Sequence, residues 1–168
     1  MGNLERLIVQ QIPSLRRYAR ALTNDAERAD DLVQDCLERA WSRINLWHRG
    51  HNIRPWLFTI MHNIFVNDAK RYSRAQLIPL PAVELPDDKS PTHETELNLR
   101  DLKIALATLP IEQRQVILLV GLEGLRYEEV ARIVGVPVGT VMSRLSRGRK
   151  RLRQLLAGES QLQLERLK

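Results

Sequence analysis

Six arginine and lysine residues fall within the ten positions from Arg144 to Arg153, close to the end of the 168-residue chain. Cations at this density can neutralise the phosphates of a nucleic acid. A basic run alone, however, fits a solvated helix face equally well. The choice between these two interpretations depends on the spacing of the residues that precede and interrupt the run.

That spacing fits a helix-turn-helix motif. Such a motif needs a small residue where its helices cross, a residue that accepts a positive φ in the turn, and an apolar anchor in the second helix. With Tyr127 as the first position, Ala131 is the fifth, Gly135 the ninth and Val141 the fifteenth. Pro137 suits the start of the second helix, where a missing amide donor does no harm. The motif therefore predicts binding in the DNA major groove.

The second helix of the motif has an inward and an outward side. The residues spaced to face inward are Val141, Leu145, Gly148 and Leu152. The residues facing outward on the half that enters a groove are Met142, Ser143, Ser146 and Arg147. The flanking cations, suited to phosphates, are Arg144, Arg149, Lys150, Arg151 and Arg153. An arginine that binds guanine through two hydrogen bonds supplies discrimination, whereas the flanking cations supply salt-sensitive affinity.

An acidic helix is predicted in the N-terminal half, beginning after a cap at Thr23 or Asn24. Its apolar stripe is Ala29, Leu32, Val33, Cys36, Leu37, Ala40 and Trp41, at helical steps of three and four. Its opposite face is Asp30, Asp31, Gln34, Asp35 and Glu38. This face has the wrong sign for DNA, so it indicates either a protein partner or a solvated surface.

A loop at 45–54 and a helix from Pro55 to about Tyr72 come next. Trp47, Arg54 and Trp56 combine aromatic faces with a cation, which can hold unstacked bases. The alternative is that both tryptophans pack in the core. The apolar stripe of the helix is Leu57, Ile60, Met61, Ile64, Phe65, Ala69 and Tyr72. Its polar and basic side includes Asn63, Asn67, Lys70 and Arg71.

The chain lacks an alternating strand pattern, so we expect an all-α fold of two small helical domains. Four of its eight prolines and a net charge of −4 lie between residues 76 and 98, which predicts a flexible acidic linker. The predicted units are a first module at 1–75, the linker at 76–98, a second module at 99–158 and a tail at 159–168. In the first module, Pro13 predicts a kink or a break within a helix between Leu4 and Leu22.

Three segments, in this order, resemble the extracytoplasmic-function (ECF) type of bacterial sigma-70 factor. DDLVQDCLERAW is similar to the family's core-polymerase-binding helix, and RPWLFTIMHNIFVNDAKR to its promoter-melting and −10 segment. LATLPIEQRQVILLVGLEGLRYEEVARIVGVPVGTVMSRLSRGRKRL is similar to its −35-binding region. The resemblance covers nearly the whole chain and implies two helical domains, called σ2 and σ4, with no enzymatic activity and no cofactor.

The resemblance also implies partners and roles. Core RNA polymerase is expected to bind through the β′ clamp helices and the β flap, with Asp31, Gln34, Asp35 and Glu38 on the β′ side. Promoter melting and −10 contacts are expected from Trp47, Arg54, Trp56, Asn63, Asn67, Lys70 and Arg71. Contacts with the −35 element are expected from Met142, Ser143, Arg144, Ser146, Arg147, Arg149 and Lys150. An anti-sigma factor is expected to hold the protein in check, as part of a stress or extracytoplasmic response.

Two residues depart from the family pattern. Arg126 stands where members often have a serine cap, and Met142 stands where some have arginine. We therefore do not transfer a −35 sequence from those members to this chain.

Two other functions are compatible with parts of the sequence. A stand-alone helix-turn-helix regulator is the first alternative, although no dimer interface or ligand pocket is evident in the sequence. A metal site built on His48, His51, His62 and Cys36 is the second, but Cys36 lies on an apolar stripe and the chain has no other cysteine. We therefore expect no metal site, and we also expect no membrane span. A cytoplasmic location is expected because the N-terminus lacks a signal-peptide pattern and a lone cysteine suits a reducing compartment.

Overall fold

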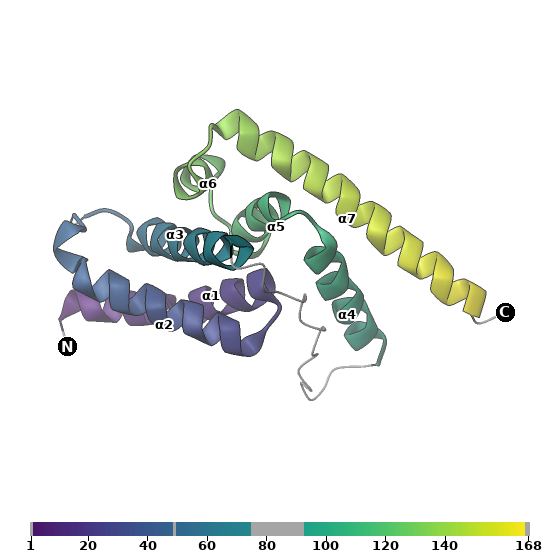
Figure 1. The fold of residues 1–168 in the computed structure, drawn as a ribbon, viewed down its shortest axis with the longest axis horizontal. Helices are drawn as coiled ribbons and strands as arrows, with labels where there is room; N and C mark the ends of the chain where they lie inside the picture. The colour runs from purple at the N-terminus through teal and green to yellow at the C-terminus, as the bar shows by residue number, and fades with distance from the viewer. Residues whose placement is uncertain (1, 49, 75–92, 167–168) are drawn as a thin grey trace.

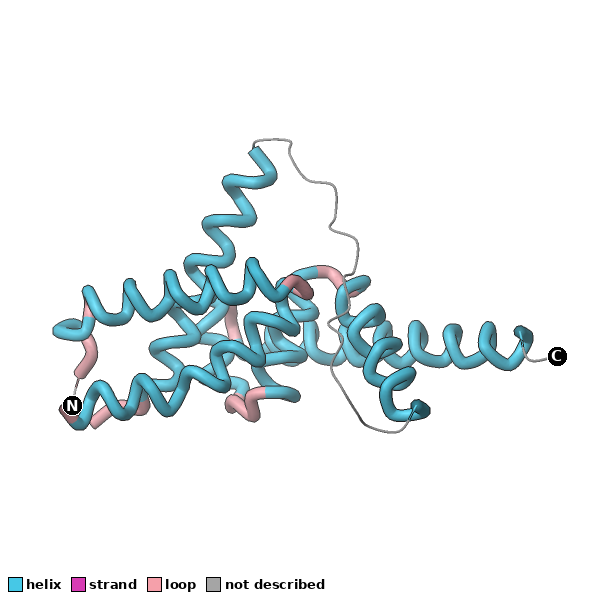
Figure 2. Tube along the Cα trace, turned by 90° about the horizontal axis from the view of Figure 1, so that it is seen from below, coloured by secondary structure: helices cyan, strands magenta, loops and turns pink. Residues whose placement is uncertain are grey.

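The computed structural model describes residues 2–48, 50–74 and 93–166. Every regular element in these ranges is helical, as Figure 2 shows, which confirms the prediction of an all-α fold with two helical domains. None of the described helices is long and apolar enough to cross a membrane. Most of the predicted linker, 76–98, lies outside the described residues.

The first module is a bundle of α1 (Asn3–Thr23), α2 (Ala26–Ser42) and α3 (Ile53–Arg74) (Figure 1). The short helix η1 (Ile44–Leu46) begins the connection from α2 to α3. α1 and α2 form a helical hairpin, because Asn24 takes a left-handed conformation with φ 53° and ends α1.

The cap of α2 differs from the prediction. Asp25, rather than Thr23 or Asn24, is the cap, and its carboxylate accepts a 3.0 Å hydrogen bond from the backbone N–H of Arg28. Thr23 is instead the last residue of α1, and its hydroxyl donates to the carbonyl of Ala19. The prediction was wrong because α1 continues to the very start of the turn.

α1 runs through Pro13, so the break allowed for by the sequence does not occur. A proline leaves the carbonyl four residues earlier, here that of Val9, without its helical donor. Both Pro13 and Val9 are exposed, so water can satisfy that carbonyl. Ile8 and Leu15 are buried on either side and anchor both halves of the helix in the core.

The predicted apolar stripes are largely buried, with exceptions. On α2, Trp41 is 52% exposed, although the stripe placed it inside. On α3, Ala69 is exposed, whereas Phe58 and His62 are buried outside the predicted stripe. The reason lies in the packing of α3, which contacts α6 of the second module in addition to α1 and α2. A helix with two buried sides does not show a single stripe in its sequence.

The second module contains α4 (His93–Thr108), α5 (Ile111–Ile117), the π-helical turn η2 (Leu118–Leu122), α6 (Tyr127–Val134) and α7 (Val138–Arg166). α4 begins before Leu99, within the segment predicted as linker, and α7 extends through most of the predicted tail. Between α6 and α7 lies the turn of the helix-turn-helix.

The helix-turn-helix has the geometry its spacing predicted. Gly135 has φ 72° and ends α6, and Ala131 and Val141 are buried. Arg126 caps α6 without a side-chain hydrogen bond, but its backbone N–H donates to the carboxylate of Glu129 at 2.9 Å. Glu129 thus supplies part of what a serine cap would provide.

The two modules share one apolar core. Buried residues from Ile8 in α1 to Leu145 in α7 form a single cluster, with contacts between α3 and α6 and between α1 and η2. The guanidinium of Arg114 in α5 donates to the carbonyl of Leu22 at the end of α1, at 2.9 Å. The protein is therefore closed, with its second module seated on its first (Figure 1).

Gly148 is essential to the packing of α7 on α5. A Cβ atom there would lie 2.7 Å from Cδ1 of Ile117 and 3.2 Å from Cβ of Gln113. We expect Gly148→Leu to lower the free energy of unfolding by about 1–3 kcal/mol through overpacking, as measured by urea denaturation. Gly158→Leu, on the same helix but with open space around it, is the control and should leave stability unchanged or raise it. Equal stability of the two variants would refute this account of the contact.

Candidate polymerase-binding and DNA-binding surfaces

The acidic face of α2 is a free surface of the first module. Asp31, Gln34, Asp35 and Glu38 are all exposed, and the Gln34 amide donates to Glu38 at 3.3 Å. The face therefore presents carboxylates that make no ion pair within the described structure. It offers a negative surface to a partner.

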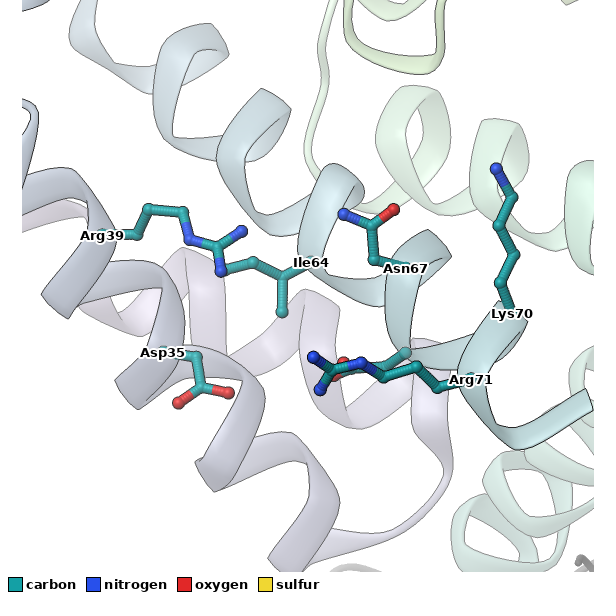
Figure 3. A pocket seen from close by; sticks show the side chains of 7 residues that line it. Asp35, Arg39, Ile64, Asn67, Lys70 and Arg71 are labelled. Atoms are coloured by element: carbon teal, nitrogen blue, oxygen red, sulfur yellow. The ribbon is translucent and has the colours of Figure 1, made fainter. Parts of the chain in front are cut away.

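This acidic face adjoins the polar side of α3. An open hollow of about 420 Å³ lies between the two helices (Figure 3). Its lining residues are Asp35, Arg39, Ile64, Asn67, Asp68, Lys70 and Arg71. Asp35, a predicted polymerase-binding residue, thus lies across one hollow from Asn67, Lys70 and Arg71, which are predicted −10-binding residues.

The predicted −10 residues of α3 form one exposed face. Asn63, Asn67, Lys70 and Arg71 are all accessible. Amide and cationic groups on an open helix face can contact phosphates and base edges.

Trp47 and Trp56 are neither fully exposed for stacking on bases nor fully buried in the core. Trp47 and Trp56 are half-buried and pack against the core, so each keeps part of its surface accessible. The ring N–H of Trp47 is buried and has no hydrogen-bond partner among the residues that the structure describes. Both tryptophans therefore pack partly in the core, and each keeps part of its ring accessible.

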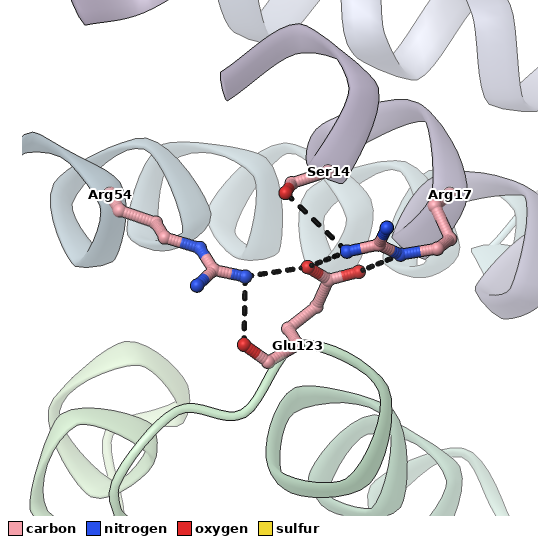
Figure 4. Close-up of polar contacts among 4 residues, drawn as sticks. All are labelled: Ser14, Arg17, Arg54 and Glu123. Atoms are coloured by element: carbon pink, nitrogen blue, oxygen red, sulfur yellow. Dashed lines mark hydrogen bonds and ion pairs between the residues drawn. The ribbon is translucent and has the colours of Figure 1, made fainter. Parts of the chain in front are cut away.

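Arg54 departs from the expected arrangement. Its Nη2 donates at 2.7 Å to the carboxylate and at 2.7 Å to the backbone carbonyl of Glu123, in the second module (Figure 4). The guanidinium also lies 5.7 Å from the centre of the Phe58 ring. In the closed chain Arg54 therefore joins the two modules instead of lying on an open DNA-binding surface.

The predicted −35 residues lie on the N-terminal half of α7. Those that are exposed are Met142, Ser143, Ser146, Arg147, Arg149 and Lys150. Arg144 is half-buried and lies near His62 of α3. Burial, and then the charge of Arg144, lower the pKa of His62 below its ordinary value. The groove-facing side of α7 is open, while Arg144 turns toward the first module.

Sequence reasoning missed the pair of Arg17 and Glu123. Glu123 lies in the GLEGL turn, flanked by glycine and leucine, and its side chain is completely buried. Arg17 is 106 positions away, and no periodic pattern links a turn to a distant helix. A carboxylate in an apolar turn was the only available signal.

The histidines and the cysteine proposed for a metal site do not come together. Among the residues that the structure describes, no three His, Cys, Asp or Glu side chains are placed to hold a metal ion. His48 and His51 stack edge to face at 6.1 Å, whereas His62 is buried beside the second module. Cys36 lies in the core, and its thiol donates to the carbonyl of Leu57 at 3.5 Å.

The Cys36 thiol is expected to be inert in the folded protein. Burial raises the pKa of Cys36 to about 12, so at neutral pH roughly one thiol in 10⁵ is ionised. We expect a maleimide to label Cys36 only after unfolding, as followed by mass spectrometry with and without urea. Labelling of the native protein at the rate of a free cysteine would contradict this assignment.

Each module matches a family model, and curated relatives match both modules together. Residues 8–62 match the family described as the Sigma2 domain of PhyR, and residues 99–152 match Sigma-70, region 4. The ECF RNA polymerase sigma factor EcfG of Rhodopseudomonas palustris is 38% identical over 89% of this chain and 82% of its own length. SigE of Mycolicibacterium smegmatis, another ECF sigma factor, is 33% identical over 95% of this chain and 64% of its own length.

A solved structure agrees with both modules together. The sigma factor RpoE of Bartonella quintana, in complex with the anti-sigma factor NepR, superposes with a TM-score of 0.81 at 34% identity. The match covers 94% of this chain and 98% of that one.

These matches define a sigma-70-type protein with a region 2 and a region 4 module. The chain belongs to the ECF RNA polymerase sigma factors. Its relatives are sigma factors, which are not enzymes, and they do not favour the alternative of a stand-alone helix-turn-helix regulator.

Proposed function

We propose that this ECF sigma factor binds core RNA polymerase in the cytoplasm and directs it to a specific set of promoters, where it supports strand opening. The observation that carries the proposal is the separation of charge over the surface. One exposed acidic face on α2 is distinct from exposed polar and basic faces on α3 and α7. The acidic face has the wrong sign for DNA and therefore suits a protein partner.

Core polymerase is the partner for the acidic face of α2. Asp31, Gln34 and Asp35, with Glu38, are our candidates for the contact with the β′ clamp helices, and the second module is the candidate for the β flap. Complementary charge across such a contact mainly sets specificity and association rate. These exposed carboxylates make no ion pair among the described residues, which supports this role because they can pair with a partner without first breaking other contacts.

Promoter DNA is the partner for α3 and α7. Asn63, Asn67, Lys70 and Arg71, with Trp47, Arg54 and Trp56, are the candidates for the −10 element and the melted strand. The −35 element is assigned to Met142, Ser143, Ser146 and Arg147, with Arg144, Arg149 and Lys150 on phosphates. The open N-terminal half of α7 supports entry into a major groove.

An anti-sigma factor is the proposed regulator of this chain, in a stress or extracytoplasmic response. The support is the similarity over nearly the full length to a sigma factor solved with an anti-sigma factor. The same comparison involves both modules, so an inhibitor that holds them together fits the closed form described above.

The proposal is tested by promoter selection from a randomised library. Fragments retained by the chain with core polymerase are recovered, and run-off transcripts are counted with each component omitted in turn. We expect transcripts only when both are present. Retention of the same fragments, with equal affinity, by the chain without polymerase would contradict the proposal.

A further inference from the structure

Glu123 joins the two modules through both oxygens of its carboxylate. One oxygen accepts from Nε of Arg17 at 3.0 Å, and the other accepts from Nη2 of Arg17 at 2.9 Å and from Nη2 of Arg54 at 2.7 Å (Figure 4). Both arginines belong to the first module, whereas Glu123 ends η2 of the second. All its described ion pairs therefore cross between the modules.

The buried carboxylate of Glu123 depends on its two arginine partners while the modules are closed. Its side chain is completely buried, and an ionised carboxylate in such a site needs its partners. Glu123 also affects Tyr18 of α1. Burial, and then the negative charge of Glu123, raise the pKa of the Tyr18 hydroxyl above its ordinary value. When the modules separate, water must replace the two guanidinium groups.

Promoter binding requires the modules to separate. Elements at −35 and −10 are about 25 base pairs apart by their numbering, or about 85 Å along a duplex at roughly 3.4 Å per base pair. In the closed chain, α3 packs directly against α6 of the helix-turn-helix. The two DNA-binding surfaces therefore cannot occupy both elements in this form.

We propose that Glu123 is an inter-module latch that holds the free chain in an autoinhibited form, and that Arg54 exchanges Glu123 for a nucleic-acid phosphate when the chain opens on a promoter. The guanidinium of Arg54 binds Glu123 in the closed chain and phosphate in the open chain. Closing the chain therefore removes a DNA contact, and it also holds the two DNA-binding surfaces too close together for the −35 and −10 elements. The inhibitory consequence rests on the proposed function, whereas the latch itself does not.

The latch is tested in the full-length free chain by single-molecule energy transfer. Fluorophores are attached at Ser42→Cys in α2 and Gln154→Cys in α7, two exposed positions, while the buried Cys36 stays unlabelled. We expect Glu123→Gln to lower the ratio of closed to open molecules at least tenfold. The matched control is Glu112→Gln, an exposed glutamate of the same module, which should leave the ratio unchanged.

Further variants separate a latch from a merely structural role. Arg17→Gln changes a half-exposed side chain, so the fold survives, and it should also open the chain. Added to Glu123→Gln it should have little further effect, because the contact is already lost. Unchanged energy transfer in both single variants would overturn the latch.

Autoinhibition is tested separately, by the rate at which promoter complexes form. With core polymerase present, Glu123→Gln should form promoter complexes at least about threefold faster than the unmodified chain. Opening without faster complex formation would overturn autoinhibition while leaving the latch intact. If the unmodified chain never binds core polymerase, the proposed function fails, and the energy-transfer result still decides the latch.

Discussion

Reversing the charge of Asp31 and Asp35 together to lysine should weaken binding to core RNA polymerase by about 30- to 150-fold. This corresponds to about 2–3 kcal/mol, the scale of like-charge contacts at a protein interface. Both side chains are exposed on the same face of α2 and stand outside the apolar core. The fold should therefore survive, and affinity is measured by fluorescence anisotropy with labelled protein and core enzyme.

The control for this change is Glu27→Lys, another exposed acidic residue of α2 that lies in its first turn. It removes a favourable interaction with the helix dipole of about 0.3–1 kcal/mol, and it lies one helical turn before Asp31, outside the residues proposed for the contact. Its effect on polymerase affinity should stay within about twofold. If the double reversal binds core polymerase as tightly as the control, the assignment of the acidic face is wrong.

Replacing Arg147 with alanine should cost about 1–3 kcal/mol of binding to the preferred −35 sequence, or about 5- to 150-fold in affinity. Arg147 is exposed on the groove-facing half of α7 and has no described ion pair. Loss of a two-hydrogen-bond contact with guanine should also relax the preference at one base position. The measurement is holoenzyme affinity for promoters carrying each base in turn at every −35 position.

Arg151→Ala provides the contrast on the same helix. Arg151 is exposed beyond the groove-facing half, and we expect its cation to contact phosphate. This variant should weaken binding to all −35 sequences uniformly and reduce the salt dependence. If Arg147→Ala behaves in the same way as Arg151→Ala, Arg147 binds phosphate and reads no base.

Local chemistry made the helix-turn-helix predictable from sequence. Gly135, Ala131 and Val141 each satisfy a steric requirement that depends on near neighbours, and all three have the expected burial or backbone conformation. The capping of α2 by Asp25 was missed by one or two residues, because adjacent Thr23, Asn24 and Asp25 are all suited to a cap.

Contacts between distant segments were not predictable in the same way. On α3, His62 lies near Arg144 of the second module and Phe58 contacts Tyr18 of α1, and no single helical period reveals both buried sides. Arg54 is a residue type that commonly contacts DNA. Its pairing with Glu123 depends on how the two modules pack. The sequence therefore indicated a candidate DNA surface on α3 and α7 but not the contact between Arg54 and Glu123 that joins the modules.

Strand opening is the most direct test of the central claim that this chain is a promoter-opening sigma factor. A selected promoter carries 2-aminopurine within its −10 element, and fluorescence is followed after mixing with the chain, with core polymerase, or with both. The account predicts a fluorescence rise, from unstacking of the base, only when the chain and core polymerase are both present. A promoter that stays closed with both components, yet binds the chain equally well without polymerase, would contradict it.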